Sequence, residues 1–264
     1  MKINRLLLAV LFIGSLLGGC KGKDGDPGPA GTAGPAGPAG PTGPAGQNLT
    51  GNLFGFVAPF DEYGNAIPKN GVSVTLEGVT PAATVTTDAN GRYEFTSLRN
   101  GTYNLAFNRS GLALVRRLGV AHVGGDQPTF LGTSSISAPS TTTVGPVSVT
   151  NVSSAGVSLS IPFSNPGMPA GNFARFAIYA SANSGTTAAN GTLLTTFSSS
   201  TSPLNVTFSK ATFNSAGFAS GTTVYVVVYG APAVLTGYND PLTGRVVYNG
   251  LTAVSSNQVA ITVP

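Results

Sequence analysis

The sequence of 264 residues contains no tryptophan, one cysteine, one histidine and few charged residues. A single cysteine cannot form an intrachain disulfide, so the folded parts must depend on apolar cores. Only 8% of the residues are charged, and the net charge of +4 is not gathered in a dense basic segment, which argues against a nucleic-acid partner. The 36 glycines and 19 prolines instead favour short strands joined by turns, so we expect an all-β fold.

Side chains that carry chemistry are equally scarce. His122 has no cysteine, histidine or carboxylate near it in the sequence, which favours a structural role over catalysis or metal binding. The sequence shows no phosphate loop, dinucleotide fingerprint or serine nucleophile elbow. No glycosidase pair is apparent among the carboxylates beyond residue 47, which are Asp61, Glu62, Glu77, Asp88, Glu94, Asp126 and Asp240. We therefore predict that the protein is not an enzyme and has no catalytic residues, metal site or cofactor.

The N-terminal segment has the layout of a secretory leader. Lys2 and Arg5 form a positive region, and an apolar run follows from Leu6 to Leu17. A membrane span needs about 20 apolar residues, so this run has the length of a signal-peptide core instead. We expect residues 1–19 to be a signal peptide.

The leader ends in Leu-Gly-Gly-Cys at positions 17–20, which resembles a bacterial lipobox. This resemblance implies cleavage between Gly19 and Cys20 and a lipid on the Cys20 thiol, with palmitate among the acyl chains. The alternative is an ordinary leader followed by an incidental cysteine. The expected partner of Cys20 is a membrane, and the expected location is the bacterial cell envelope, at the outer membrane or the cell surface.

Residues 20–47 form a collagen-like segment. Glycine recurs at every third position, and proline fills many of the positions between, as at 34–39 (Gly-Pro-Ala-Gly-Pro-Ala). Only glycine fits the axis of three wound polyproline-II chains, so this period is typical of collagen. Two arrangements stay open: an extended spacer in a monomer, or a triple helix in a homotrimer. Either one would hold the following residues away from a membrane.

Residues 48–138 alternate between apolar and polar with a period of two, as half-buried strands do. The apolar positions are Val72, Val74 and Leu76, then Tyr93 and Phe95, then Tyr103, Leu105 and Phe107. Turn signals separate these runs, including Asp-Ala-Asn-Gly at 88–91 and Arg-Asn-Gly at 99–101. The spacing predicts a β-sandwich.

The run Thr-Thr-Asp-Ala-Asn-Gly-Arg-Tyr-Glu-Phe-Thr-Ser-Leu-Arg-Asn-Gly-Thr-Tyr-Asn-Leu at 86–105 resembles the carboxypeptidase regulatory-like domain. Gly-Phe-Val at 55–57 adds to the resemblance. It implies a seven-stranded, transthyretin-like sandwich that serves as an accessory module and carries no catalytic residues. Asp88 is then expected to form an Asx turn, which we favour over a calcium ligand because no carboxylate cluster accompanies it.

Residues 139–264 predict a second β-sandwich of about seven strands. Alternation recurs at Val157–Ile161, Phe176–Ala180, Leu204–Phe208, Val224–Val228 and Val259–Val263. The strand at 221–229 and the terminal strand resemble fibronectin type III or immunoglobulin-like modules. The fold class is therefore all-β, with two tandem sandwiches after a signal peptide and a collagen-like stalk.

A long excursion from Ala231 to Asn257 interrupts the second sandwich. Loops at the ends of sandwiches often carry recognition, so the candidates for a ligand-binding loop are Tyr238, Asp240, Arg245 and Tyr248. Asn-Gly at 249–250 is the expected turn of a hairpin within it. We favour the alternative, in which the excursion is a solvated hairpin that binds nothing specific.

These features predict a non-catalytic cell-envelope lipoprotein that displays β-sandwich modules on a stalk for adhesion, with an unknown protein or glycan as partner. The alternative is a carbohydrate-binding accessory lipoprotein of a nutrient-uptake system. The lack of tryptophan removes the commonest platform for sugar stacking, although Tyr238 or Tyr248 would serve in its place.

Overall fold

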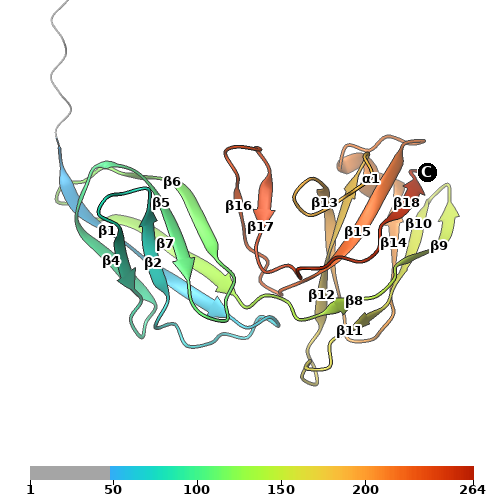
Figure 1. Cartoon of the computed structure of the whole chain (residues 1–264), viewed down its shortest axis with the longest axis horizontal. Coiled ribbons are helices and arrows are strands. Elements are labelled where there is room, and N and C mark those ends of the chain that lie inside the picture. The colour runs from blue at the N-terminus through green and yellow to red at the C-terminus, as the bar shows by residue number, and fades with distance from the viewer. Residues whose placement is uncertain (1–47) are drawn as a thin grey trace, which may run out of the picture. The chain divides into compact units, whose positions relative to one another are not determined.

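The computed structural model describes residues 48–264, so the predicted signal peptide, the cleavage site at Gly19 and Cys20, and the collagen-like repeat lie outside the described residues. The described part contains eighteen strands and one helix of six residues, which confirms the all-β prediction (Figure 1). None of its helices has the length and apolar character needed to cross a membrane.

The first sandwich is built from two sheets. One has the order β4-β1-β7 and the other the order β3-β2-β5-β6. The strands are β1 (Thr50–Phe60), β2 (Ser73–Glu77), β3 (Ala83–Thr86), β4 (Arg92–Arg99), β5 (Gly101–Asn108), β6 (Val115–His122) and β7 (Thr129–Ser137). β1 is the central strand of the smaller sheet, and it pairs antiparallel with β4 and parallel with β7.

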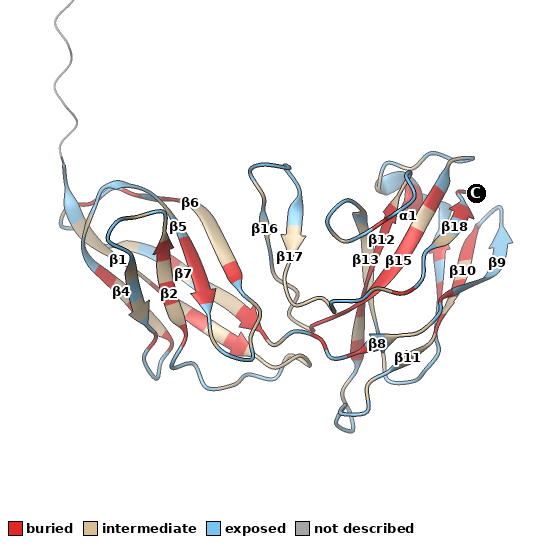
Figure 2. Cartoon of the chain, viewed as in Figure 1, coloured by how far each residue is buried: buried red, intermediate tan, exposed pale blue. Residues whose placement is uncertain are grey.

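The core of this sandwich contains the residues that the alternation predicts. Val74 and Leu105 are fully or almost fully buried, and so is Leu53 on β1. Tyr93 packs edge-to-face against Phe107, with ring centroids 5.7 Å apart. Buried and less buried residues alternate along β1 and β2, as the two-residue period of a strand requires (Figure 2).

The second sandwich also has two main sheets, with the orders β14-β10-β9 and β13-β12-β15-β18. Two short pairs of strands accompany them, β8·β11 and the hairpin β16·β17. Its elements are β8 (Thr143–Val144), β9 (Ser148–Ser153), β10 (Gly156–Ile161), β11 (Phe163–Ser164), β12 (Ala174–Ser181), β13 (Thr192–Ser199), β14 (Leu204–Ser209), α1 (Lys210–Ser215), β15 (Thr223–Ala231), β16 (Gly237–Asn239), β17 (Val246–Tyr248) and β18 (Val259–Thr262). Each of the five strand patterns expected from the sequence corresponds to a strand here.

β12 and β15 are buried on both faces, which is unusual for an antiparallel sheet. One face joins the main core through residues such as Phe176 and Val228. The other carries Tyr179 and Tyr229, whose rings meet edge-to-face at 5.8 Å. The excursion at 231–257 covers this second face, since Leu235, Tyr248 and Leu251 pack against it.

The excursion does contain a hairpin, but the prediction of its turn at Asn249-Gly250 is wrong. β16 and β17 are joined through 240–245 instead, where the Asp240 N–H donates to the Arg245 carbonyl at 2.8 Å. The Asp240 carboxylate accepts from the Leu242 N–H at 3.0 Å, as in an Asx turn, and this local bonding fixes the reversal. Asn249-Gly250 follows β17 and leads the chain back to the sheet.

Candidate functional site

Three phenylalanine side chains gather on the outward face of the β4-β1-β7 sheet. Phe54 on β1 lies directly opposite Phe130 on β7, and their rings stack with centroids 5.0 Å apart and an interplanar angle of 27°. Phe56 meets Phe130 edge-on at 6.2 Å. Phe130 is 58% exposed. We call Phe54, Phe56 and Phe130 the aromatic cluster.

The period of β1 places these rings outside the core. Leu53, Gly55 and Val57 point inward and are buried, so Phe54 and Phe56 point outward on the same strand. An outward position on a solvated sheet face normally carries a polar side chain. The cluster therefore leaves aromatic surface in water, a feature that marks interaction sites in soluble proteins.

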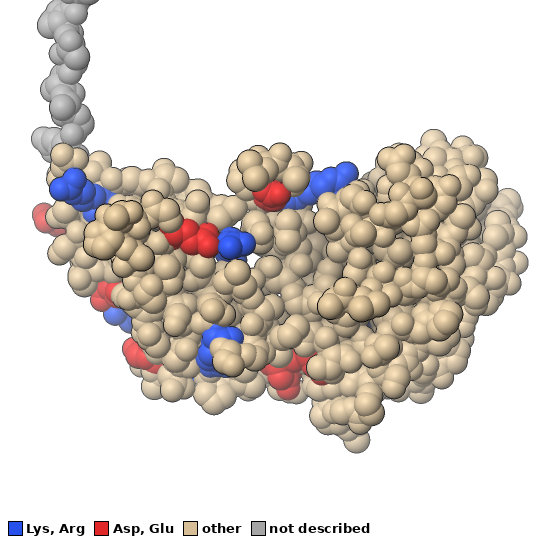
Figure 3. Space-filling model, viewed as in Figure 1, with Lys and Arg blue, Asp and Glu red and all other residues tan. Residues whose placement is uncertain are grey.

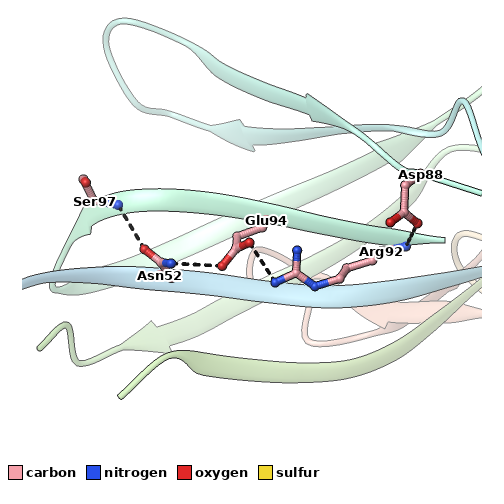
Figure 4. A network of polar contacts seen from close by, with 5 residues as sticks. All are labelled: Asn52, Asp88, Arg92, Glu94 and Ser97. Atoms are coloured by element: carbon pink, nitrogen blue, oxygen red, sulfur yellow. Dashed lines mark hydrogen bonds and ion pairs between the residues drawn. The ribbon is translucent and has the colours of Figure 1, made fainter. Parts of the chain in front are cut away.

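A row of polar side chains runs beside the cluster on β4. The Arg92 guanidinium lies over the Phe54 ring, 4.9 Å from its centroid, and pairs with Glu94 through Nη2 and Oε2 at 2.7 Å. Glu94 also accepts a hydrogen bond from the Asn52 side-chain amide at 3.0 Å. Figure 4 shows that Asn52, Glu94 and Arg92 form one continuous chain of contacts.

A β-bulge ends this row. The pairing of β1 with β4 shifts register between Gly51 and Leu53, and Ser97 on the bulged strand adopts a φ of 53°. The Ser97 N–H donates to the side-chain oxygen Oδ1 of Asn52 at 3.4 Å (Figure 4). Bulges and left-handed non-glycine residues are commoner beside functional sites, where they redirect side chains.

At the other end of the row, Asp88 holds the start of β4. Its carboxylate accepts from the backbone N–H groups of Asn90 and Arg92, each at 2.8 Å. This confirms the expected Asx turn. Within residues 48–264, no group of three or more metal-ligating side chains occurs.

Next to the aromatic cluster lies an open hollow of about 470 Å³, which we call the polar groove. Its lining includes the side chains of Asn52, Phe54, Glu94, Ser97 and Asp126. Backbone forms part of the lining at Gly51, where a Cβ would come within 2.7 Å of the Gly125 carbonyl oxygen. The charged residues in its lining are Arg92, Glu94 and Asp126, so the lining has a net charge of −1. Charged side chains are sparse over the whole visible surface (Figure 3).

The predicted loop residues occupy different places. Tyr238 lies near Arg116 and Arg117 on β6. The pKa of Arg116 is raised mainly by its hydrogen bond with Glu77 and, to a smaller extent, by one with Tyr238. Asp240 is used in the hairpin turn.

Arg245 and Tyr248 are brought together beside Tyr179, where all three line a second hollow. The Arg245 guanidinium donates to the carbonyls of Asn190 and Gly191 at 2.7 and 3.1 Å. Tyr248 packs on the covered face of the sheet. The structure thus divides the four residues between separate environments, and ligand binding by this loop stays a prediction.

His122 has structural partners. It is buried, with Nδ1 2.7 Å from the Thr129 hydroxyl oxygen and Nε2 3.1 Å from the Leu98 carbonyl oxygen. It therefore ties the end of β4 to the start of β7, and both ring nitrogens are occupied.

One protein-family model matches part of the first sandwich. Residues 53–131 match the model of the family described as carboxypeptidase regulatory-like domain, which confirms the resemblance for that part of the chain. The search of curated proteins found no match.

Among solved structures, the chain is similar to a type II cohesin–X-dockerin complex from Acetivibrio cellulolyticus, at 20% identity over 34% of this chain and 58% of that chain, with a TM-score of 0.28. It is also similar to a DUF3823 family protein from Bacteroides uniformis, at 12% identity over 81% of this chain and all of that chain (100%), with a TM-score of 0.28. A third is the major pilin SpaD from Corynebacterium diphtheriae, at 13% identity over 81% of this chain and 67% of that chain, with a TM-score of 0.26.

Proposed function

We propose that the protein is a non-catalytic binding protein of the bacterial cell envelope. Cys20 carries the lipid that anchors it, residues 20–47 act as a stalk, and the β4-β1-β7 face meets an external ligand. The observation that carries this proposal is the exposed aromatic cluster next to the polar groove. Solvent-exposed aromatic side chains next to polar groups favour binding, because aromatic rings supply a large contact area at little cost in conformational entropy.

The bonding of the polar row supports binding rather than acid–base chemistry. Both oxygens of Glu94 have partners, Arg92 on one side and Asn52 on the other. These contacts fix the direction of each side chain before a ligand arrives. Such preorganisation lowers the cost of association.

Two settings fit this proposal. In the first, the protein is an adhesin or scaffold, and a trimeric stalk would multiply weak single sites. In the second, it is an accessory lipoprotein that binds carbohydrate for a nutrient-uptake system. The mixture of aromatic and polar groups on one face favours the second setting, and the ligand class is argued in the next subsection.

The anchor is tested by expressing the full chain and Cys20→Ser in a bacterial host fed with labelled palmitate. We expect label and membrane association for the native chain, and loss of both for Cys20→Ser. A native chain that is secreted without lipid would contradict the proposed anchoring.

Display of the binding face is tested with a second cysteine. Since Cys20 is the sole cysteine and is taken up by lipid, Phe130→Cys creates one free thiol. We expect a membrane-impermeant maleimide to label Phe130→Cys on intact cells. The matched control is Ala177→Cys, which is fully buried and should react only after denaturation. Labelling of Phe130→Cys only in lysed cells would show that the face does not look outward from the cell.

A further inference from the structure

We infer that the aromatic cluster and the polar groove together bind an uncharged carbohydrate chain. This inference rests on the proposed binding function and names its ligand class. The face combines two kinds of group that a sugar needs side by side. These are a flat apolar platform and planar polar side chains with fixed directions.

The platform is the Phe54–Phe130 pair. Phe130 is more than half exposed, and its ring is stacked with Phe54 rather than buried under neighbouring side chains. A pyranose ring presents C–H groups on one face, and these carry the partial positive charge that the negative face of an aromatic ring attracts. The exposed ring of Phe130 therefore offers a stacking surface for one sugar residue.

The polar groups lie within reach of the same platform. Asn52 and Glu94 line the groove together with Phe54, and Arg92 lies over the Phe54 ring. Sugar hydroxyls are both donors and acceptors, and planar amide, carboxylate and guanidinium groups bind two neighbouring hydroxyls at once. A chain stacked on Phe130 would thus extend its next residues along the groove.

The charge of the groove excludes acidic chains. Arg92 is the one cation among the groove-lining residues, and it is already paired with Glu94. Asp126 then stands without an opposite charge among the lining residues. A polyanion would meet repulsion there, whereas an uncharged polysaccharide would not.

The backbone around the groove is held firmly. The Ser97 bulge fixes one end and the Asp88 turn fixes the other, so Asn52, Glu94 and Arg92 start from set positions. A rigid site suits a ligand with many weak hydrogen bonds, because little order has to be gained on binding.

The test uses the full chain, purified in detergent, in native affinity gels that contain one soluble polysaccharide each. The uncharged probes are xylan, galactomannan, mixed-linkage β-glucan and soluble starch, and alginate is the polyanionic control. We expect at least one uncharged probe to retard the protein and alginate to have no effect. Phe130→Ala should weaken that retardation by about tenfold or more, as the loss of a central aromatic contact does.

Two further variants distinguish a specific site from non-specific binding to exposed aromatic side chains. Asn52→Ala removes a polar contact and should weaken binding severalfold while leaving the Phe130 platform in place. Phe173→Ala is the matched control, since Phe173 is 56% exposed but lies in the second sandwich, and binding should be unchanged. Thermal melts of each variant confirm that the fold is retained.

The inference is overturned if no uncharged probe retards the native chain, if alginate is preferred, or if Phe130→Ala and Asn52→Ala bind as well as Phe173→Ala does. These outcomes leave the palmitate and maleimide experiments untouched, so an anchored, surface-displayed protein that ignores polysaccharides would overturn the ligand class alone. Conversely, sugar binding by a chain that carries no lipid would overturn the anchoring alone.

Discussion

Phe54 and Phe130 lie in register on neighbouring parallel strands, and their rings stack 5.0 Å apart although the two residues are far apart in the sequence. This pairing exists because the chain leaves the β3-β2-β5-β6 sheet after β6 and crosses to the other sheet, where β7 pairs with β1. The fold thereby assembles the aromatic cluster from the first and the last strand of one sandwich. Several consequences for stability and binding can be measured.

Phe130→Ala should hardly alter the stability of the fold. More than half of its side chain is already in water, so truncation should change the free energy of unfolding by less than about 1 kcal/mol. Phe107→Ala is the comparison, because Phe107 is fully buried and its loss should cost about 3–5 kcal/mol. Urea titrations of both variants give the two values. A large loss of stability for Phe130→Ala would show that the ring serves packing rather than binding.

Tyr93→Phe should be neutral or stabilising near pH 7. The Tyr93 side chain is buried, and its hydroxyl has no hydrogen-bond partner among the described residues. Removing an unpaired buried hydroxyl relieves a desolvation cost of about 1 kcal/mol or more. Denaturant unfolding at pH 7 measures the change, and a clear loss of stability would mean that the hydroxyl has a partner, for instance a bound water.

The free energy of unfolding should also fall at alkaline pH because of the Tyr93 hydroxyl. Burial raises the pKa of Tyr93 to about 12, from an ordinary tyrosine value of about 10. The folded state therefore favours the neutral phenol, so this contribution to stability is complete below pH 10 and falls as the pH rises toward 12. The expected loss across that interval is about 2 to 3 kcal/mol. Unfolding measured at pH 9, 10 and 11 should show a smaller loss in Tyr93→Phe than in the native chain.

Gly55→Ala should destabilise the first sandwich. A Cβ at Gly55 would lie 2.7 Å from the Tyr93 hydroxyl oxygen and 3.0 Å from the Gly132 carbonyl oxygen, and neither group can move without disturbing the core. Overpacking of this kind costs about 1–3 kcal/mol. Gly101→Ala is the matched control, because its Cβ would make only ordinary contacts at 3.7 Å or more. Equal melting temperatures for the two variants would contradict the close approach.

Ser97→Val should weaken both the fold and the groove. Ser97 has a φ of 53°, which a β-branched residue adopts at a cost of about 1–3 kcal/mol. The neighbouring Thr96→Val is the control, since Thr96 is exposed and has no positive φ, and its effect should stay within about 0.5 kcal/mol. Thermal unfolding of the pair distinguishes backbone strain from a general effect of adding valine to this strand.

Much of the strand framework could be predicted from the sequence, because apolar side chains recur every second residue and glycine-containing turns separate them. Leu105 and Phe107 are buried where the alternation placed them. The aromatic cluster was harder to find. β1 is apolar on both sides, with Leu53 facing in and Phe54 facing out, so periodicity alone cannot say which side meets water.

The second sandwich shows the same limit. The strand at 224–228 could be predicted from its alternation, but nothing local revealed that Tyr248 and Leu251 would cover its second face. The Asn-Gly pair at 249–250 is a favourable hairpin turn in isolation. The side chain of Asp240 nevertheless set the reversal elsewhere, because it bonds its own following backbone.

The position of β1 has a mechanical consequence. This strand is the first element of the described chain, and it is bonded along its length to β4 on one side and to β7 on the other. Tension applied at residue 48 along the strand direction would act on both ladders in shear, so many hydrogen bonds would have to break together rather than one at a time. The strand that carries Phe54 is thus held on both sides at once, which would resist its being pulled out of the sheet.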